Sequence, residues 1–217
     1  MSWFRSACGG RLQPAVGGLK PAATLILVLL AGCRTAHVVG PAIAPLPALT
    51  TQSPIDALLA RAETFPGARS VMRVRVATGG QTRSFRGQLI VENREHMELI
   101  AYTPVGTTAA TIRAEGQQVT VTDALTGSVT GGNADELLAE YGFFTGGLTP
   151  AEMGMLILGY PPRRDLLYEA TPTGLGRATA GDVVVTFDPP ALPAQHVVIE
   201  HGADRVEIDH LEVAAMK

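Results

Sequence analysis

Apolar and polar side chains alternate along the chain after residue 70, and this alternation predicts β-strands. In VMRVRVAT, residues 71–78, Met and two Val share one face and two arginines the other. The arginine face is expected to be a solvated sheet surface, the alternative being a patch for anions or lipid head groups. A Gly-Gly pair predicts a turn before SFRGQLIVE, 84–92, and segments of strand length follow at 96–102, 107–115 and 118–125. Turns of hairpin size join these five segments, so we expect an antiparallel meander.

Three segments have helical periodicity: SPIDALLARAE at 53–63, NADELLAEY at 133–141 and TPAEMGMLILGYPP at 149–162. The first and third each begin with a hydroxyl residue followed by proline, which is typical of a helix start. The second begins with Asn133, and Glu136 three residues later approximates a capping box. The third segment is apolar on nearly every side, which predicts that its helix is enclosed by the rest of the fold.

Strand patterns return in the last quarter of the chain, in DLLYEA, DVVVTFD, HVVIE and RVEIDHLEV, at 165–170, 182–188, 196–200 and 205–213. The order is therefore helix, meander, two helices and further strands. This order predicts one domain over residues 53–217, of the α+β class and mainly β. Its expected architecture is an incomplete antiparallel β-barrel, a long curved sheet that encloses short helices or is capped by them.

The first 32 residues have the composition of an export signal. Arg5, Arg11 and Lys20 make the start basic, no acidic residue accompanies them, and an apolar run follows at 22–30. That run is too short for a transmembrane helix, which needs ~20 residues. The whole chain has 217 residues and a net charge of −3, so neither length nor charge indicates a nucleic-acid partner.

The signal ends in Leu30-Ala31-Gly32-Cys33, which resembles the lipobox of bacterial lipoproteins. The resemblance implies cleavage before Cys33 and acylation of its thiol; the alternative is an ordinary secretory signal. Cys8 would leave with the signal, so the mature chain would have no cysteine pair for a disulfide. Prolines in residues 34–52 predict an extended tether between the anchor and the domain. Arg34 after the cysteine, in place of aspartate, favours the outer membrane, with the protein facing the periplasm.

Candidate enzyme motifs do not satisfy their own geometry. GSVTG at 127–131 is not a nucleophile elbow, and GLGRATAG at 174–181 leads into a strand, so we expect its glycines to form turns. His196 and His201 should point to opposite faces of a strand, and with His210 they lack the spacing of a zinc site. No basic stripe carries aromatic residues, as nucleic-acid binding would require. The sequence predicts no enzyme activity, no cofactor and no metal.

Residues 97–127, 131–141 and 148–162 together resemble the outer-membrane lipoprotein receptor of the Lol pathway and its relatives in the LolA/LolB superfamily. In that family an incomplete barrel with internal helices encloses an apolar cavity that holds acyl chains. The resemblance implies a lipid-anchored protein that accepts acyl chains of lipoproteins or lipids from a periplasmic carrier protein and passes them to the membrane. It also places Val105, in the turn 103–106, at the position of a membrane-insertion loop.

The expected cavity lining combines inward positions of the sheet with the apolar helix. Methionine suits such a pocket because its flexible side chain adapts to different ligands. A packed core would use the same residues, so an envelope assembly or interaction lipoprotein without ligand transfer is the alternative function. A connected cavity would favour the carrier, and a filled interior the alternative. The candidate residues are Met72, Val74, Phe85, Leu89, Met97, Leu99, Met153, Leu156 and Ile157.

Overall fold

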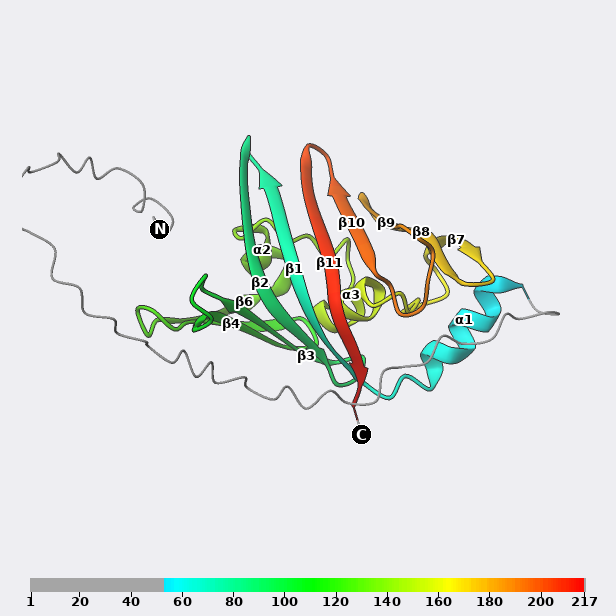
Figure 1. Ribbon diagram of the computed structural model, residues 1–217, viewed down its shortest axis with the longest axis horizontal. Coiled ribbons are helices and arrows are strands. Elements are labelled where there is room, and N and C mark those ends of the chain that lie inside the picture. The colour runs from blue at the N-terminus through cyan, green and yellow to red at the C-terminus, as the bar shows by residue number, and fades with distance from the viewer. Residues whose placement is uncertain (1–52, 217) are drawn as a thin grey trace, which may run out of the picture. The chain divides into compact units, whose positions relative to one another are not determined.

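The computed structural model describes residues 53–216. The signal at 1–32, Cys33 and the tether at 34–52 lie outside the described residues, so these divisions stay predictions. Within 53–216, eleven strands form one antiparallel sheet in the order β6-β5-β4-β3-β2-β1-β11-β10-β9-β8-β7 (Figure 1). The predicted fold class is confirmed, because the sheet is long, curved and not closed, and a few short helices accompany it.

The elements follow the sequence in an order that makes nearly all sheet neighbours consecutive strands. The helices are α1 (Pro54–Glu63), α2 (Ala134–Ala139) and α3 (Pro150–Ile157). The strands are β1 (Ala68–Thr78), β2 (Gln81–Val91), β3 (His96–Tyr102), β4 (Thr108–Glu115), β5 (Gln118–Asp123), β6 (Val129–Asn133), β7 (Leu167–Thr171), β8 (Gly174–Ala180), β9 (Val183–Phe187), β10 (His196–His201) and β11 (Asp204–Ala215).

The exception to this order lies in the middle of the sheet, where the first and last strands pair. β1 lies between β2 and β11, and Val74 is opposite Phe85 on one side and Ile208 on the other. The alternation in β1 has the predicted effect, since Val74 is buried while Arg73 and Arg75 are exposed. The predicted meander from β1 to β5 is confirmed.

Two glycine-rich strands, β6 and β8, were not expected from the sequence. The prediction that the glycines of 174–181 form turns is wrong for Gly174 and Gly176, which lie within β8. Gly181, with φ +58°, does occupy the following turn. A Cβ on Gly174 would lie 2.5 Å from the carbonyl carbon of Ala191, so glycine is needed there to let a neighbouring segment pass close to the strand.

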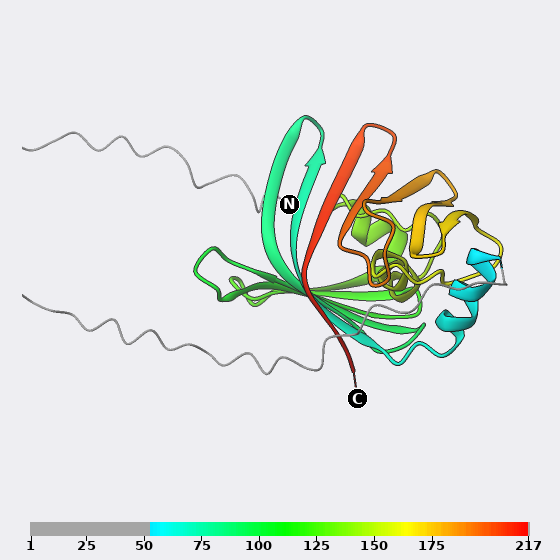
Figure 2. The same cartoon turned by 45° about the vertical axis from the view of Figure 1, so that its right-hand side comes forward.

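Helices α2 and α3 lie in the hollow of the curved sheet, as Figure 2 shows from the side. The predicted start of α3 is confirmed, and it is a capping box: the Thr149 hydroxyl accepts from the Glu152 N–H and the Glu152 carboxylate accepts from the Thr149 N–H. Asn133 caps α2 through the Asp135 N–H instead of through a box with Glu136. Burial of α3 confirms that it is enclosed, and a Cβ on Gly154 would lie only 2.7 Å from Val91 of β2.

The buried apolar side chains of all three helices and of most strands form one cluster. Residues 53–216 therefore supply a hydrophobic core of their own. In this part of the chain, no helix has both the length and the hydropathy needed to cross a bilayer.

Candidate functional site

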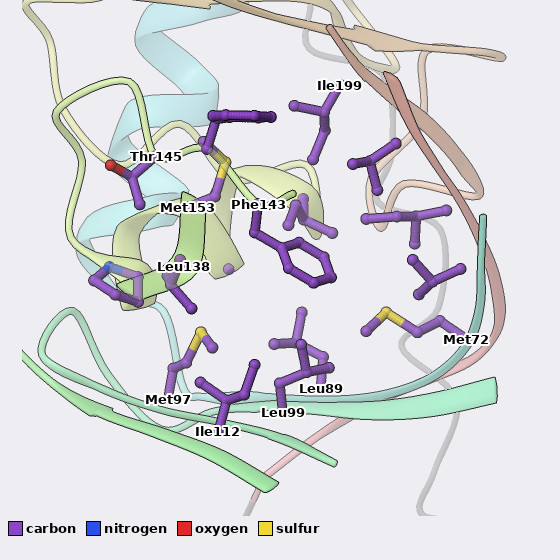
Figure 3. A pocket seen from close by; sticks show the side chains of 17 residues that line it. Met72, Leu89, Met97, Leu99, Ile112, Leu138, Phe143, Thr145, Met153 and Ile199 are labelled. Carbon is purple, nitrogen blue, oxygen red and sulfur yellow. The ribbon is translucent and has the colours of Figure 1, made fainter. Parts of the chain in front are cut away.

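A small apolar cavity lies between the concave face of the sheet and α3 (Figure 3). Its volume is about 60 Å³. Of the described side chains that line it, Thr145 alone is polar. The lining comes from both halves of the sheet, from α2 and α3, and from the segment between these helices. The residues are Met72, Val74, Leu89, Met97, Leu99, Ile112, Leu138, Phe143, Phe144, Thr145, Pro150, Met153, Gly154, Ile157, Ile199, Val206 and Ile208.

The structure brings most of the residues proposed from the sequence to this cavity. Phe85 and Leu156 do not line it: Phe85 is half-buried against the core, and Leu156 is fully buried. Their contact with a ligand, like that of the others, stays a prediction. The residues proposed from the sequence that do line the cavity are Met72, Val74, Leu89, Met97, Leu99, Met153 and Ile157.

Sequence reasoning missed the residues that cover the cavity. Phe143 and Phe144 belong to the segment Glu140–Leu148 between α2 and α3, which we call the lid. The only signal in the sequence was a pair of consecutive phenylalanines flanked by glycines, in GFFTGG. A loop with no apolar period gives no indication of which way its side chains point. Figure 3 shows the Phe143 ring pointing into the cavity toward Leu89 and Leu99.

The lid is fixed to the rest of the domain at several points. The Thr145 hydroxyl is buried and donates to the Asp135 carboxylate on α2, so the one polar group of the lining is satisfied. The Phe144 ring stacks on the His201 ring with a centroid separation of 4.1 Å. A Cβ on Gly146, where φ is +62°, would lie 2.2 Å from the Ala180 carbonyl oxygen. The lid therefore packs tightly against β8 and the end of β10.

His201 is itself oriented by a carboxylate. Its Nε2 lies 2.8 Å from Asp182 Oδ2, in the turn between β8 and β9. This hydrogen bond lowers the pKa of the Asp182 carboxyl. The imidazole is thus held in one orientation, with its flat face available to Phe144 of the lid.

The cavity has less room than an acyl chain requires. For comparison, an apolar cavity of ~150 Å³ binds one benzene molecule. The cavity of about 60 Å³ is well below this value. Phe143 occupies the space between the sheet and α3 that a larger ligand would need (Figure 3).

His210 joins β11 to β1 and to the end of α3 in the interior. Its Nδ1 lies 2.6 Å from Ser70 Oγ, and its Nε2 lies 3.1 Å from the Ile157 carbonyl oxygen. The carbonyl can only accept, so Nε2 carries the proton and Nδ1 accepts from the Ser70 hydroxyl. Burial lowers the pKa of His210 to about 4. The imidazole is therefore neutral near pH 7.

The other histidines of the C-terminal strands have separate partners. His196 lies 2.8 Å from Asp209, on the neighbouring strand. In the described part of the chain, no three His, Cys, Asp or Glu side chains are grouped as metal ligands would be.

Val105 lies at the tip of the turn between β3 and β4 and is 85% exposed. The Thr103 N–H donates to the Thr107 carbonyl at 2.8 Å, and the Gly106 N–H donates to the Thr103 carbonyl at 2.9 Å. Gly106 has φ +87°, a conformation that glycine adopts without strain. The turn is well formed and presents Val105 to the outside; its role in membrane insertion stays a prediction.

No family model matches this chain, and no curated protein matches its sequence. Solved structures with a similar fold include a LolA superfamily protein from Nitrosomonas europaea, with 10% identity, a TM-score of 0.47, and coverage of 76% of this chain and 95% of that one. A DUF1329 family protein from Desulfovibrio piger has 10% identity and a TM-score of 0.49, over 76% and 94% of the two chains. A putative outer membrane lipoprotein-sorting protein domain from Vibrio parahaemolyticus has 6% identity and a TM-score of 0.46, over 72% and 90%.

Proposed function

We propose that this protein is a lipid-anchored carrier of the cell envelope that accepts acyl chains of lipoproteins or lipids. The observation that carries the proposal is the lining of the cavity. It is apolar apart from Thr145, whose hydroxyl is already satisfied, and it includes Met72, Met97 and Met153. A ligand recognised by such a lining has to be apolar and flexible, as an acyl chain is.

Uptake of an acyl chain requires the lid to move, because the cavity of about 60 Å³ is too small. Phe143 is the side chain that would leave. Gly142, with φ +79°, directly precedes it in a segment that has no strand partner, and it is a suitable hinge. Exchanging an apolar ring for an acyl chain changes the buried apolar area little. Direction of transfer would then depend on small differences in affinity between successive sites.

We also propose where the protein is located and which protein delivers its ligand. Acylated Cys33 would anchor the protein, Arg34 favours the outer membrane, and the tether would let the domain stand clear of the bilayer. A periplasmic carrier protein would deliver the acyl chains, and Val105 would contact the membrane during release, as in a receptor of the Lol pathway. We propose no catalytic step and no cofactor for this role, since a carrier requires neither.

Binding of a fluorescent fatty acid to residues 53–217, which contain their own core, tests the proposal. Wild type should bind the probe saturably. Phe143→Ala should bind it several-fold more tightly, because the smaller side chain leaves room that the ligand would otherwise have to create. Met153→Arg should abolish binding, because a guanidinium cannot enter the apolar cavity without a partner.

Leu167→Arg is the matched control, because Leu167 is 74% exposed and lies on β7, outside the cavity lining. It should bind as wild type does. Circular dichroism establishes that each variant is folded. If folded Phe143→Ala and Met153→Arg both bind like wild type, the probe does not enter this cavity, and the carrier proposal is wrong.

The small size of the cavity favours a second candidate function. A protein whose interior is filled in its working state would be an assembly or interaction lipoprotein of the envelope, with the same fold and no ligand transfer. This second function predicts that neither wild type nor Phe143→Ala binds the fluorescent fatty acid saturably. The same titration therefore separates the two functions.

A further inference from the structure

The hairpins β3–β4 and β5–β6 end in two turns that carry exposed apolar side chains and no charge. We propose that these turns, Thr103–Thr107 and Ala124–Val129, together form a contact surface for a zwitterionic phospholipid bilayer. We call them the hairpin edge. The inference rests on the proposed lipid-carrying function and extends it from one turn to a two-turn surface, with Leu125 and Val129 as new contact residues.

The two turns lie next to each other because of the strand order. β4 pairs with β3 on one side and with β5 on the other. The Ala124 N–H, at the start of the second turn, donates to the Ala109 carbonyl of β4 at 3.0 Å. Figures 1 and 2 both show these green hairpins projecting beyond the helices in the hollow of the sheet. Both turns can therefore meet one flat surface.

Exposed apolar side chains are concentrated on this edge. Val105 is 85% exposed, Leu125 61% and Val129 64%. They are three of the six large hydrophobic side chains that are exposed within residues 53–216. Single exposed apolar residues are normal on any surface, whereas a group of them at one edge is typical of a binding surface.

The charge distribution indicates the kind of partner. The chain has no Asp, Glu, Lys, Arg or His in residues 99–112 or 124–134. In contrast, the turn between β10 and β11 is bordered by His201, Asp204 and Arg205. A surface for anionic lipids carries Lys or Arg, and charged groups resist entry into a bilayer interface. Asp123, just before the second turn, has a carboxylate that accepts from the Leu125 N–H within the protein. Beyond it the edge is neutral and apolar, which fits a bilayer with no net charge.

The turns are also suited to leave water because several of their backbone N–H groups are already paired. The Thr103 N–H donates to Thr107, and the Gly127 N–H donates to the Asp123 carbonyl at 2.8 Å. Asp123 Oδ1 accepts from the Leu125 N–H at 2.8 Å. An unpaired backbone group would be costly to bring into a bilayer, and these bonds lower that cost. They also fix the turns, so little conformational freedom is lost on contact.

Flotation of residues 53–217 with phosphatidylcholine vesicles tests the inference. Wild type should bind weakly, and raising the salt from about 0.1 M to about 1 M should not release it, because residues 103–107 and 124–129 carry no charge that could attract the bilayer. Val105→Ser and Leu125→Ser should each lower the partition coefficient by roughly tenfold. Leu167→Ser is the matched control, since Leu167 is equally apolar and 74% exposed but lies on β7. It should bind as wild type does.

A tryptophan at position 125 provides a second measurement. The single tryptophan of the chain is Trp3, so residues 53–217 have no other indole. In Leu125→Trp, vesicles should shift the emission to the blue and brominated lipids should quench it. Leu167→Trp should show neither effect.

Three results would overturn the inference. The first is equal binding by wild type and the two serine variants. The second is binding that requires anionic lipid and is lost in salt, which would assign the contact to the arginine face of β1 and β2. The third is a change in oligomeric state on Leu125→Ser, which would make the edge a contact between copies. Fatty-acid uptake by the serine variants is measured in parallel; if uptake persists without vesicle binding, only this inference fails.

Discussion

His210 is neutral in the fold because its two ring nitrogens have partners that suit only the neutral ring. Nε2 donates to the Ile157 carbonyl at the end of α3, and Nδ1 accepts from Ser70. Protonation would place a second N–H against the Ser70 hydroxyl and a charge in the interior. The pKa of about 4 is the consequence. This residue therefore links the protonation state of the domain to the packing of α3, which forms part of the cavity wall.

We predict that the free energy of unfolding decreases as the pH falls between the pKa values of His210 in the unfolded and folded states. The pKa is about 4 in the folded state and ~6.5 in the unfolded state, so the unfolded state binds the proton first. This contribution is fully present above pH ~6.5, is lost progressively down to pH ~4 and is constant below it. The loss amounts to at most roughly 3 kcal/mol.

Urea denaturation at a series of pH values measures this effect. His210→Gln cannot titrate at this position, so the difference between wild type and variant isolates the contribution of His210. An unchanged pH dependence in His210→Gln would contradict the prediction.

At the scale of the elements, close packing keeps the lid in place, because the lid pairs with no strand of the sheet. Gly146 lies so close to β8 that a Cβ would meet the Ala180 carbonyl oxygen at 2.2 Å. Gly147, the next residue, has φ +79° and no atom within 4 Å of a Cβ position. The two glycines thus share a left-handed backbone and differ in their surroundings.

We predict that Gly146→Ala displaces the lid and that Gly147→Ala does not. Both variants should lose about 1 kcal/mol of stability through backbone strain. Gly146→Ala should lose more, because the added methyl group also collides with β8. Its fatty-acid uptake should be faster, since the lid no longer has to be released. Stopped-flow fluorescence gives the uptake rates; equal rates for the two variants would show that contact with Ala180 does not hold the lid closed.

The sequence predicted elements well where one physical signal dominated. Alternation in β1 gave the correct buried face, and Thr149 followed by Pro150 gave the correct start of α3. β6 and β8 were missed because glycines interrupt their apolar pattern. The need for Gly174 arises from the passage of Ala191, which no local pattern encodes. The two lid phenylalanines were missed for the same reason, since their burial depends on the sheet that they cover.

At the scale of the whole molecule, the proposed anchor determines where the carrier works. We predict that Cys33→Ser is not labelled by palmitate and no longer fractionates with the outer membrane. The reason is that the thiol is the site of acylation in the lipobox, and stable membrane attachment requires acyl chains. Metabolic labelling followed by membrane fractionation makes the measurement. Residues 53–217 should fold equally well in wild type and in Cys33→Ser. Undiminished palmitate labelling of Cys33→Ser would contradict the assignment of Cys33 as the anchor.

The pairing of β1 with β11 also has a consequence for the order in which the domain can form. Its two halves are built from consecutive strands, but they join only through this central pair, whose contacts include Ser70 and His210, 140 residues apart. Contacts between such distant segments form slowly, because a long loop has to close first. During synthesis, the sheet stays split until the last strand, Asp204–Ala215, has left the ribosome. The described domain therefore cannot complete its sheet until β11 has been made, and before that its two halves have no pair of strands to join them.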